Sequence, residues 1–120
     1  MILICPADKN HVAATNFVMG FTTKNISYFV GLDADTNYPQ VFLSGDDNFA
    51  IKGVPVKSGL LQLETNAPIT WTVTRHNSKR FFEGGYILLV DGSIRAAYDD
   101  LLIVRDLNES GVATNRLAIP

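Results

Sequence analysis

Hydrophobic and polar residues alternate along most of the chain, as they do in strands that bury one face. The clearest case is segment 69–76, where Ile69, Trp71 and Val73 share one face and threonines occupy the positions between them. Most of these residues are β-branched or aromatic, which favours a half-buried strand. Turn-forming residues precede and follow the segment. We therefore expect a strand here, with Trp71 in the core.

Similar short segments recur along the chain and predict further strands. They lie at 17–21, 26–30, 40–44, 49–52, 61–64 and 86–90. Pro55 cannot donate a ladder hydrogen bond, so the segment around Val54 belongs at a sheet edge or a bulge. Asp91-Gly92 between two apolar runs predicts a hairpin with a type I′ turn, which needs positive φ at both residues.

Segment 93–108 fits two interpretations. It is either a helix capped by Ser93, or a strand from Ser93 to Tyr98 followed by a core strand over Leu101–Arg105. On the strand interpretation, Val112–Ile119 forms the last strand. The total of about eight or nine short strands separated by turns predicts an all-β antiparallel sandwich, with a jelly roll favoured over an immunoglobulin-like sandwich.

Length and composition narrow the function classes. The chain has 120 residues, which predicts a single β domain over 1–120. Only 18% of its residues are charged, below the usual share of about a quarter, which indicates either surface that meets a partner or an efficient core. A net charge of −2 argues against nucleic-acid binding. Without a signal peptide or a membrane-spanning run, we expect a soluble cytoplasmic protein.

Catalytic machinery is not recognisable in the sequence. His11 and His76 are far apart, and with Cys5 they are too few for a zinc site or for the histidine cluster of a metal-binding β-barrel enzyme. No G-x-S-x-G motif is present, and Cys5 lies in an apolar context. We therefore predict no catalytic residues and no cofactor.

Asp33, Asp35 and Asn37 form the one weak candidate for a metal site. Alternate Asp and Asn residues in a loop supply the oxygen ligands that Ca²⁺ prefers. The EF-hand pattern fails, however, because Tyr38 stands where glycine is needed and Ser44 where the closing glutamate is needed. The favoured interpretation is a polar loop whose side chains bond to their own backbone.

Candidate partner-binding residues lie in a basic cluster and in the two apolar chain ends. A chain end of this kind is either paired within its own sheet or laid along a neighbouring molecule. The basic cluster is either a solvated hairpin tip or a contact for an anionic ligand. These candidates are Arg75, His76, Lys79, Arg80, Ile2, Leu3, Leu117 and Ile119.

A compact all-β chain with Asn-, Asp- and Thr-rich turns, one Cys and no active site resembles the small jelly-roll decoration or cement proteins of tailed-phage capsids. The resemblance implies a virion structural protein that forms homo-oligomers and stabilises a shell by binding between its subunits. Its partners would be other copies of itself, capsid shell protein, or both, with no nucleic acid and no membrane. The alternative is a monomeric β-sandwich module that binds a protein or a carbohydrate, and the aromatic residues that could line a carbohydrate groove are Trp71, Tyr28, Tyr38, Tyr86 and Tyr98.

Overall fold

The computed structural model describes residues 3–67, 69–72, 84–97, 105 and 107–120. The described elements are one short 3-10 helix and nine strands: η1 (Thr23–Asn25), β1 (Tyr28–Gly31), β2 (Phe42–Asp46), β3 (Phe49–Ile51), β4 (Val54–Pro55), β5 (Gly59–Glu64), β6 (Ile69–Trp71), β7 (Gly85–Leu89), β8 (Ile94–Ala97) and β9 (Thr114–Ile119). The predicted all-β class is confirmed.

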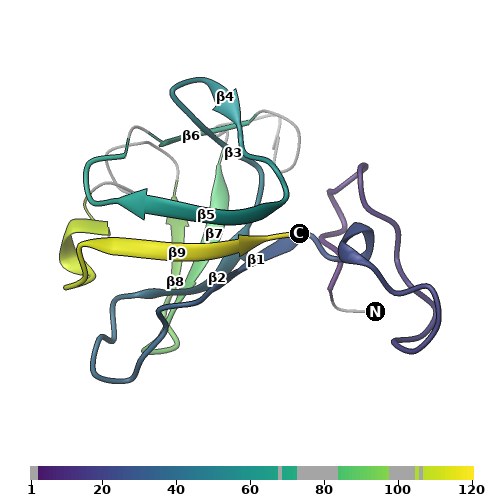
Figure 1. Cartoon of the computed structure of the whole chain (residues 1–120), viewed down its shortest axis with the longest axis horizontal. Coiled ribbons are helices and arrows are strands. Elements are labelled where there is room, and N and C mark those ends of the chain that lie inside the picture. Colours follow the sequence, from purple (N-terminus) through teal and green to yellow (C-terminus); the bar gives the residue numbers. More distant parts are fainter. Residues whose placement is uncertain (1–2, 68, 73–83, 98–104, 106) are drawn as a thin grey trace.

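The strands form two antiparallel sheets. The larger sheet has six strands in the order β5-β9-β1-β2-β7-β8, and the smaller has three in the order β4-β3-β6. In Figure 1 the smaller sheet lies at the top, while β5 and β9 run across the view and β7 and β8 run nearly vertically. This change of direction shows that the larger sheet coils around the core, as the right-handed twist of strands requires.

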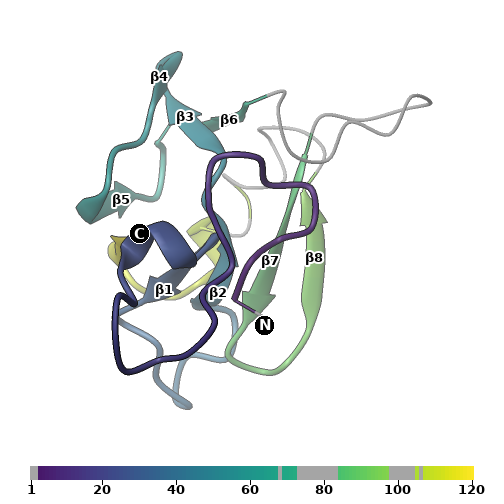
Figure 2. The same cartoon turned by 90° about the vertical axis from the view of Figure 1, so that its right-hand side faces the viewer.

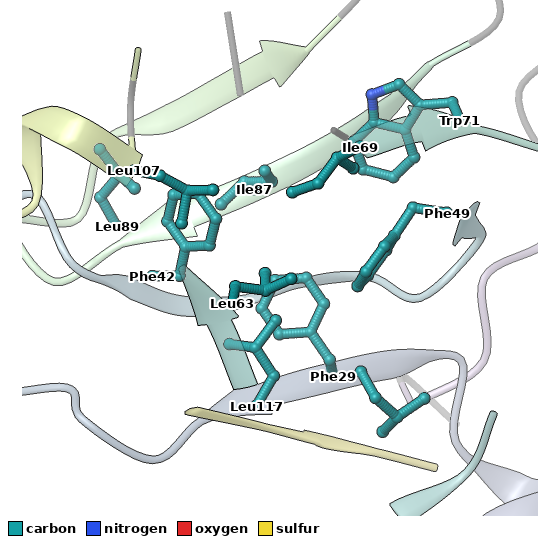
Figure 3. Close-up of a cluster of buried hydrophobic side chains, with 11 residues drawn as sticks. Phe29, Phe42, Phe49, Leu63, Ile69, Trp71, Ile87, Leu89, Leu107 and Leu117 are labelled. Carbon is teal, nitrogen blue, oxygen red and sulfur yellow. The ribbon is translucent and has the colours of Figure 1, made fainter. Parts of the chain in front are cut away.

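The core fills the space between the inner faces of the two sheets (Figure 3). Phe29 and Phe42 come from the larger sheet, and Phe49, Ile69 and Trp71 come from the smaller one. The rings of Phe29 and Phe49 meet edge to face at 6.1 Å between centroids, and those of Phe49 and Trp71 do the same at 6.1 Å. Such pairs add to the free energy of burying the rings. Trp71 is therefore a core residue, as predicted.

Gly85 of the larger sheet makes room for Trp71 of the smaller sheet, and Gly45 makes room for Phe29 on the neighbouring strand of its own sheet. A Cβ atom at Gly85 would overlap the indole ring of Trp71, and one at Gly45 would lie 2.8 Å from the ring of Phe29. Both glycines are buried. The strand pattern alone does not reveal this role, because it depends on a ring that the other sheet supplies to Gly85.

Several sequence predictions need correction. Segment 17–21 is not a strand, since residues 17–20 form bends and no sheet includes them. The strand β8 contradicts a helix that begins at Ser93, and the helical conformation of Arg105 contradicts a strand ending there. Helical residues 107–109 turn Leu107 fully into the core. Residues 101–104 lie outside the described part.

The turns are only partly as expected. The hairpin at Asp91-Gly92 is confirmed, because β7 and β8 pair on either side of it. Gly92 has a φ of 84°, but Asp91 is not among the residues with positive φ, so the turn is not type I′. Positive φ occurs at two successive residues in the β3–β4 hairpin, with 52° at Lys52 and 75° at Gly53. β4 lies at the edge of the smaller sheet, as Pro55 predicts.

We expect Gly85→Ala to destabilise the fold by about 1–3 kcal/mol, because the added methyl group overpacks the Trp71 contact. Urea unfolding followed by circular dichroism measures this. In the Trp71→Phe background the smaller ring leaves room, so the same substitution should cost clearly less. Equal losses in both backgrounds would show that the Trp71 contact is not the cause.

Candidate functional site

Residues 3–27 form an irregular arm that lies beside one end of the larger sheet, before β1 begins. Figure 2 shows this arm nearest the viewer, and Figure 1 shows it standing to one side of the two sheets. Within the arm, residues 13–23 form what we call the arm loop, and Phe17, Val18 and Met19 form the arm tip. The arm is the largest described feature outside the sheets, so its attachment and its surface both need an explanation.

The base of the arm is held by a buried carboxylate. The side chain of Asp8 is fully buried, and its Oδ2 accepts a hydrogen bond of 2.7 Å from the hydroxyl of Ser27, just before β1. The same oxygen lies 2.6 Å from Nδ1 of His11, and Oδ1 accepts from the backbone N–H of Asn10 at 2.8 Å. The backbone N–H of Ser27 also donates to the carbonyl of Leu3. These bonds join both ends of the arm to the start of the sheet.

Asp8, His11 and Ser27 have the residue types of a catalytic triad but not its arrangement. In a triad the serine hydroxyl bonds to the imidazole, which takes its proton. Here the hydroxyl of Ser27 donates to the carboxylate of Asp8, and the imidazole contacts that same oxygen. Ser27 is also fully buried. The cluster therefore positions the arm and does not activate a nucleophile.

The arm loop is closed at its neck. The N–H of Val12 donates to the carbonyl of Lys24 at 3.0 Å, and the side-chain amide of Asn25 donates to the carbonyl of Val12 at 2.7 Å. Thr22 and Asn25 form a reciprocal capping box around η1. A surface loop whose two ends meet in this way is an Ω-loop, a type that frequently carries function.

The arm tip presents large apolar side chains to solvent on a defined turn. The side-chain oxygen of Asn16 accepts hydrogen bonds from the N–H groups of Val18 and Met19, and Gly20 follows with a φ of 75°. Val18 is 90% exposed, Met19 82% and Phe17 61%. The ring of Phe17 lies 5.3 Å from that of Phe21. Asn16 and Gly20 form the turn here, and the alternating pattern of 17–21 was interpreted as a strand without taking these two residues into account.

A second apolar surface runs across the outer face of the larger sheet. The registers place one residue of every strand in a continuous line of direct partners, which we call the outer row: Leu60, Ala118, Val30, Ser44, Leu88 and Ile94. Five of the six are apolar, and Leu60, Val30 and Ile94 are each more than half exposed. Tyr86, two residues before Leu88, faces the same way and is 49% exposed. An apolar line across a whole sheet is unusual for a face in contact with water.

Cavities of the described structure include a surface groove of about 410 Å³, which is lined by Ile51, Lys52, Gln62, Glu64, Asn66, Ala67 and Thr114. The core contains a void of only about 10 Å³ between the sheets, too small for an organic ligand. A surface groove of about 320 Å³ is lined in part by Asp33, Asp35 and Tyr38. Tyr38 is 43% exposed there, while Trp71 is buried and does not line the groove.

The loop with the candidate metal ligands has other bonding partners. The guanidinium of Arg116 donates two hydrogen bonds to the carboxylate of Asp33, at 2.6 and 2.9 Å, and the backbone N–H of Arg116 donates a third. The Arg116 guanidinium holds the pKa of the Asp33 carboxyl below its ordinary value. Asp35 accepts from the backbone and side-chain N–H groups of Asn37. No group of three or more His, Cys, Asp or Glu residues in the described part is placed to hold a metal ion.

The apolar chain ends differ in their surroundings. Leu117 and Ile119, predicted as partner contacts, are 1% and 6% exposed and point into the core from β9, which lies between β5 and β1. The segment therefore pairs within its own sheet, which is the first of the two expected alternatives, and its two apolar side chains are covered there. Leu3 is partly exposed at the base of the arm. Ile2, Arg75, His76, Lys79 and Arg80 lie outside the described residues.

Comparisons with known proteins found no matching family model, no similar curated protein and no similar solved structure. Among the described residues, no helix has the length and apolar character needed to cross a lipid bilayer.

We expect Asp8→Asn to destabilise the protein by about 1–3 kcal/mol, because an amide group replaces a buried oxygen that faces hydrogen-bond donors. Urea unfolding measures the loss, and hydrogen exchange of residues 12–25 shows whether the arm opens. Asp35→Asn is the matched control, since that exposed residue also bonds to its own loop, and a change within about 0.5 kcal/mol is expected. A similar loss in both variants would contradict the role of Asp8.

The ion pair of Asp33 predicts a pH dependence. A carboxyl whose pKa is lowered by folding adds stability above its unfolded pKa, and that stability is lost as pH falls through the folded pKa. Arg116 is about half exposed, so water and salt screen the ion pair and its contribution to stability is small. The difference in unfolding free energy between wild type and Asp33→Asn should therefore be present at neutral pH and shrink as the pH falls through the acid range in which Asp33 takes up its proton. A difference that does not change with pH would assign the effect to something other than the charge.

Proposed function

We propose that this protein is a non-enzymatic structural protein that assembles with other protein subunits, including further copies of itself. The observation that supports this most directly is the outer row, which crosses all six strands with five apolar residues out of six and leaves Leu60, Val30 and Ile94 more than half exposed. A face with this composition gains free energy when a partner covers it, because apolar surface leaves water. The low charge content of the chain agrees with surface reserved for a partner.

A role in decorating or cementing a virus shell is the more specific form of this proposal. It follows from the resemblance to capsid decoration proteins of tailed phages, which bind between shell subunits. An all-β body with exposed apolar surfaces in two places suits a protein that must contact more than one neighbour. This form of the proposal includes two further parts: the sandwich is a jelly roll, and the protein is located in the virion.

The alternative of a carbohydrate-binding module is supported by one observation, the groove beside Tyr38. Aromatic residues and carboxylates do bind sugars, but Tyr38 is the one exposed aromatic residue that lines this groove. The apolar surfaces extend much further over the molecule than the groove. We therefore favour assembly.

The proposal predicts that the wild-type protein forms a discrete oligomer at micromolar concentration and that Val30→Lys abolishes it. A lysine in the middle of the outer row places a charge where the partner would exclude water. Size-exclusion chromatography with light scattering, at several protein concentrations, measures the mass.

Val54→Lys is the matched control, because Val54 is an equally exposed valine on the smaller sheet, at 63% against 52% for Val30. Circular dichroism and urea unfolding should show both variants folded. A wild-type protein that stays monomeric up to millimolar concentration would refute self-assembly.

A further inference from the structure

The strand β5 forms one edge of the larger sheet, at the outer border of the molecule (Figure 2). Edge strands of native proteins are usually short, interrupted by Pro or a bulge, or protected by charged side chains. β4, at an edge of the smaller sheet, follows this rule with two residues that include Pro55. β5 instead has six residues, no Pro and no register shift, and its one charged residue, Glu64, is the last. It keeps the form of a strand that can pair on its second side.

The register shows which backbone groups of β5 face the open edge. The carbonyl of Arg116 accepts a hydrogen bond of 2.8 Å from the N–H of Leu32, so the backbone groups of Arg116 point from β9 toward β1. Gln62, the partner of Arg116 in β5, is therefore in a non-hydrogen-bonded pair, and its own N–H and C=O point away from β9. Leu60 and Glu64, two residues to either side of Gln62, point the same way.

These outward backbone groups are available for pairing. Within the described part of the chain, the N–H and C=O of Leu60 and Gln62 and the N–H of Glu64 form no hydrogen bond. The C=O of Glu64 accepts one from the N–H of Ala67, and a carbonyl can accept a second. The groove of about 410 Å³ beside Gln62 and Glu64 leaves room for another backbone, and with Lys52 and Glu64 it holds one charge of each sign. Outward N–H and C=O groups at every second residue are the features that an extended polypeptide recognises.

We infer that β5 pairs with β5 of a second copy, antiparallel and around a two-fold axis at Gln62, so that the two larger sheets join into one. This inference rests on the proposed assembly function and names one contact through which copies meet. In this register Gln62 of each copy exchanges two hydrogen bonds with Gln62 of the other, and Leu60 does the same with Glu64. Every outward backbone group of β5 then has a partner, so the edge is complementary to itself.

The side chains of β5 fit the same register. On the inner face, the partly buried Leu61 of one copy lies opposite Leu63 of the other, which is a core residue. An apolar side chain at the border of the core thus gains an apolar cross-strand neighbour. On the outer face the amides of the two Gln62 side chains lie opposite each other. An extended segment of any sequence would satisfy the backbone groups, whereas these side-chain pairs favour a second copy.

Gln62→Pro tests the pairing through the backbone. Proline removes the N–H at the centre of the contact, and the ladder with β9 keeps its bonds because that N–H points away from it. Gln62→Val is the matched control, since it changes the side chain and keeps the N–H. A pair of short strands is a weak contact by itself, so it strengthens an oligomer that the outer row also holds. By size-exclusion chromatography with light scattering, Gln62→Pro should fall below the mass of wild type and of Gln62→Val. Circular dichroism and urea unfolding show whether the variants are folded.

A cysteine at the two-fold axis tests the register. Directly opposite residues of a hydrogen-bonded pair have Cα atoms about 5.5 Å apart, within the range of a disulfide. Most chains of Gln62→Cys should therefore form disulfide-linked dimers in oxidised glutathione, as measured on a non-reducing gel. Val54→Cys, also at an exposed position but on β4, is the control and should crosslink only to a small extent. The native Cys5 is buried.

Either of two results would overturn the inference: a folded Gln62→Pro variant that keeps the wild-type mass, or a Gln62→Cys variant that crosslinks no more than Val54→Cys. Both results leave the proposed assembly function standing if wild type is oligomeric and Val30→Lys disrupts it. If Gln62→Pro does not fold, the crosslinking comparison decides alone. A wild-type protein that stays monomeric refutes the inference and self-assembly together.

Discussion

The contact between Trp71 and Gly85 determines how closely the two sheets approach each other. Only glycine leaves room for the indole ring at that position of β7, and the ring in turn meets Phe49, which meets Phe29. This line of aromatic contacts runs from the smaller sheet to the centre of the larger one. Successive side chains of a strand point to opposite faces of the sheet. When residues such as Phe29 fill the inner face, their neighbours in the strand, such as Val30, therefore lie on the outer face. The outer row is thus a direct geometric consequence of the core.

That outer face distinguishes this protein from an ordinary sandwich. Antiparallel sheets with one solvated face usually carry polar residues there. Here Val30 and Leu60 are apolar although both are more than half exposed. Burial within the chain therefore does not explain why these positions are apolar. The same holds for Val18 at the arm tip. These exposed apolar residues are the observation on which the proposed assembly function rests.

Local patterns in the sequence were sufficient to predict most of the strands, but they did not predict the arm tip or the outer row. Ile69 and Trp71 alternate with threonines, and this signal is local, so β6 was predictable. Segment 17–21 has a similar alternation, but Asn16 and Gly20 turn the chain, and no strand pairs with it. For Leu117 and Ile119 the sequence left two alternatives open, because it does not say that β5 and β1 flank β9. The outer row depends on five registers between strands, three of which (β5 with β9, β9 with β1, and β2 with β7) join strands distant in the chain, and alternation within one strand cannot reveal these.

Trp71 is the only tryptophan of the chain, and its place in the core has a practical consequence. Its indole is buried at the junction of the two sheets and belongs to neither the arm tip nor the outer row. Its emission therefore reports whether the sheets are together, and it is insensitive to what covers the outside of the molecule. This protein thus contains an intrinsic optical probe that separates folding from association, without any added label.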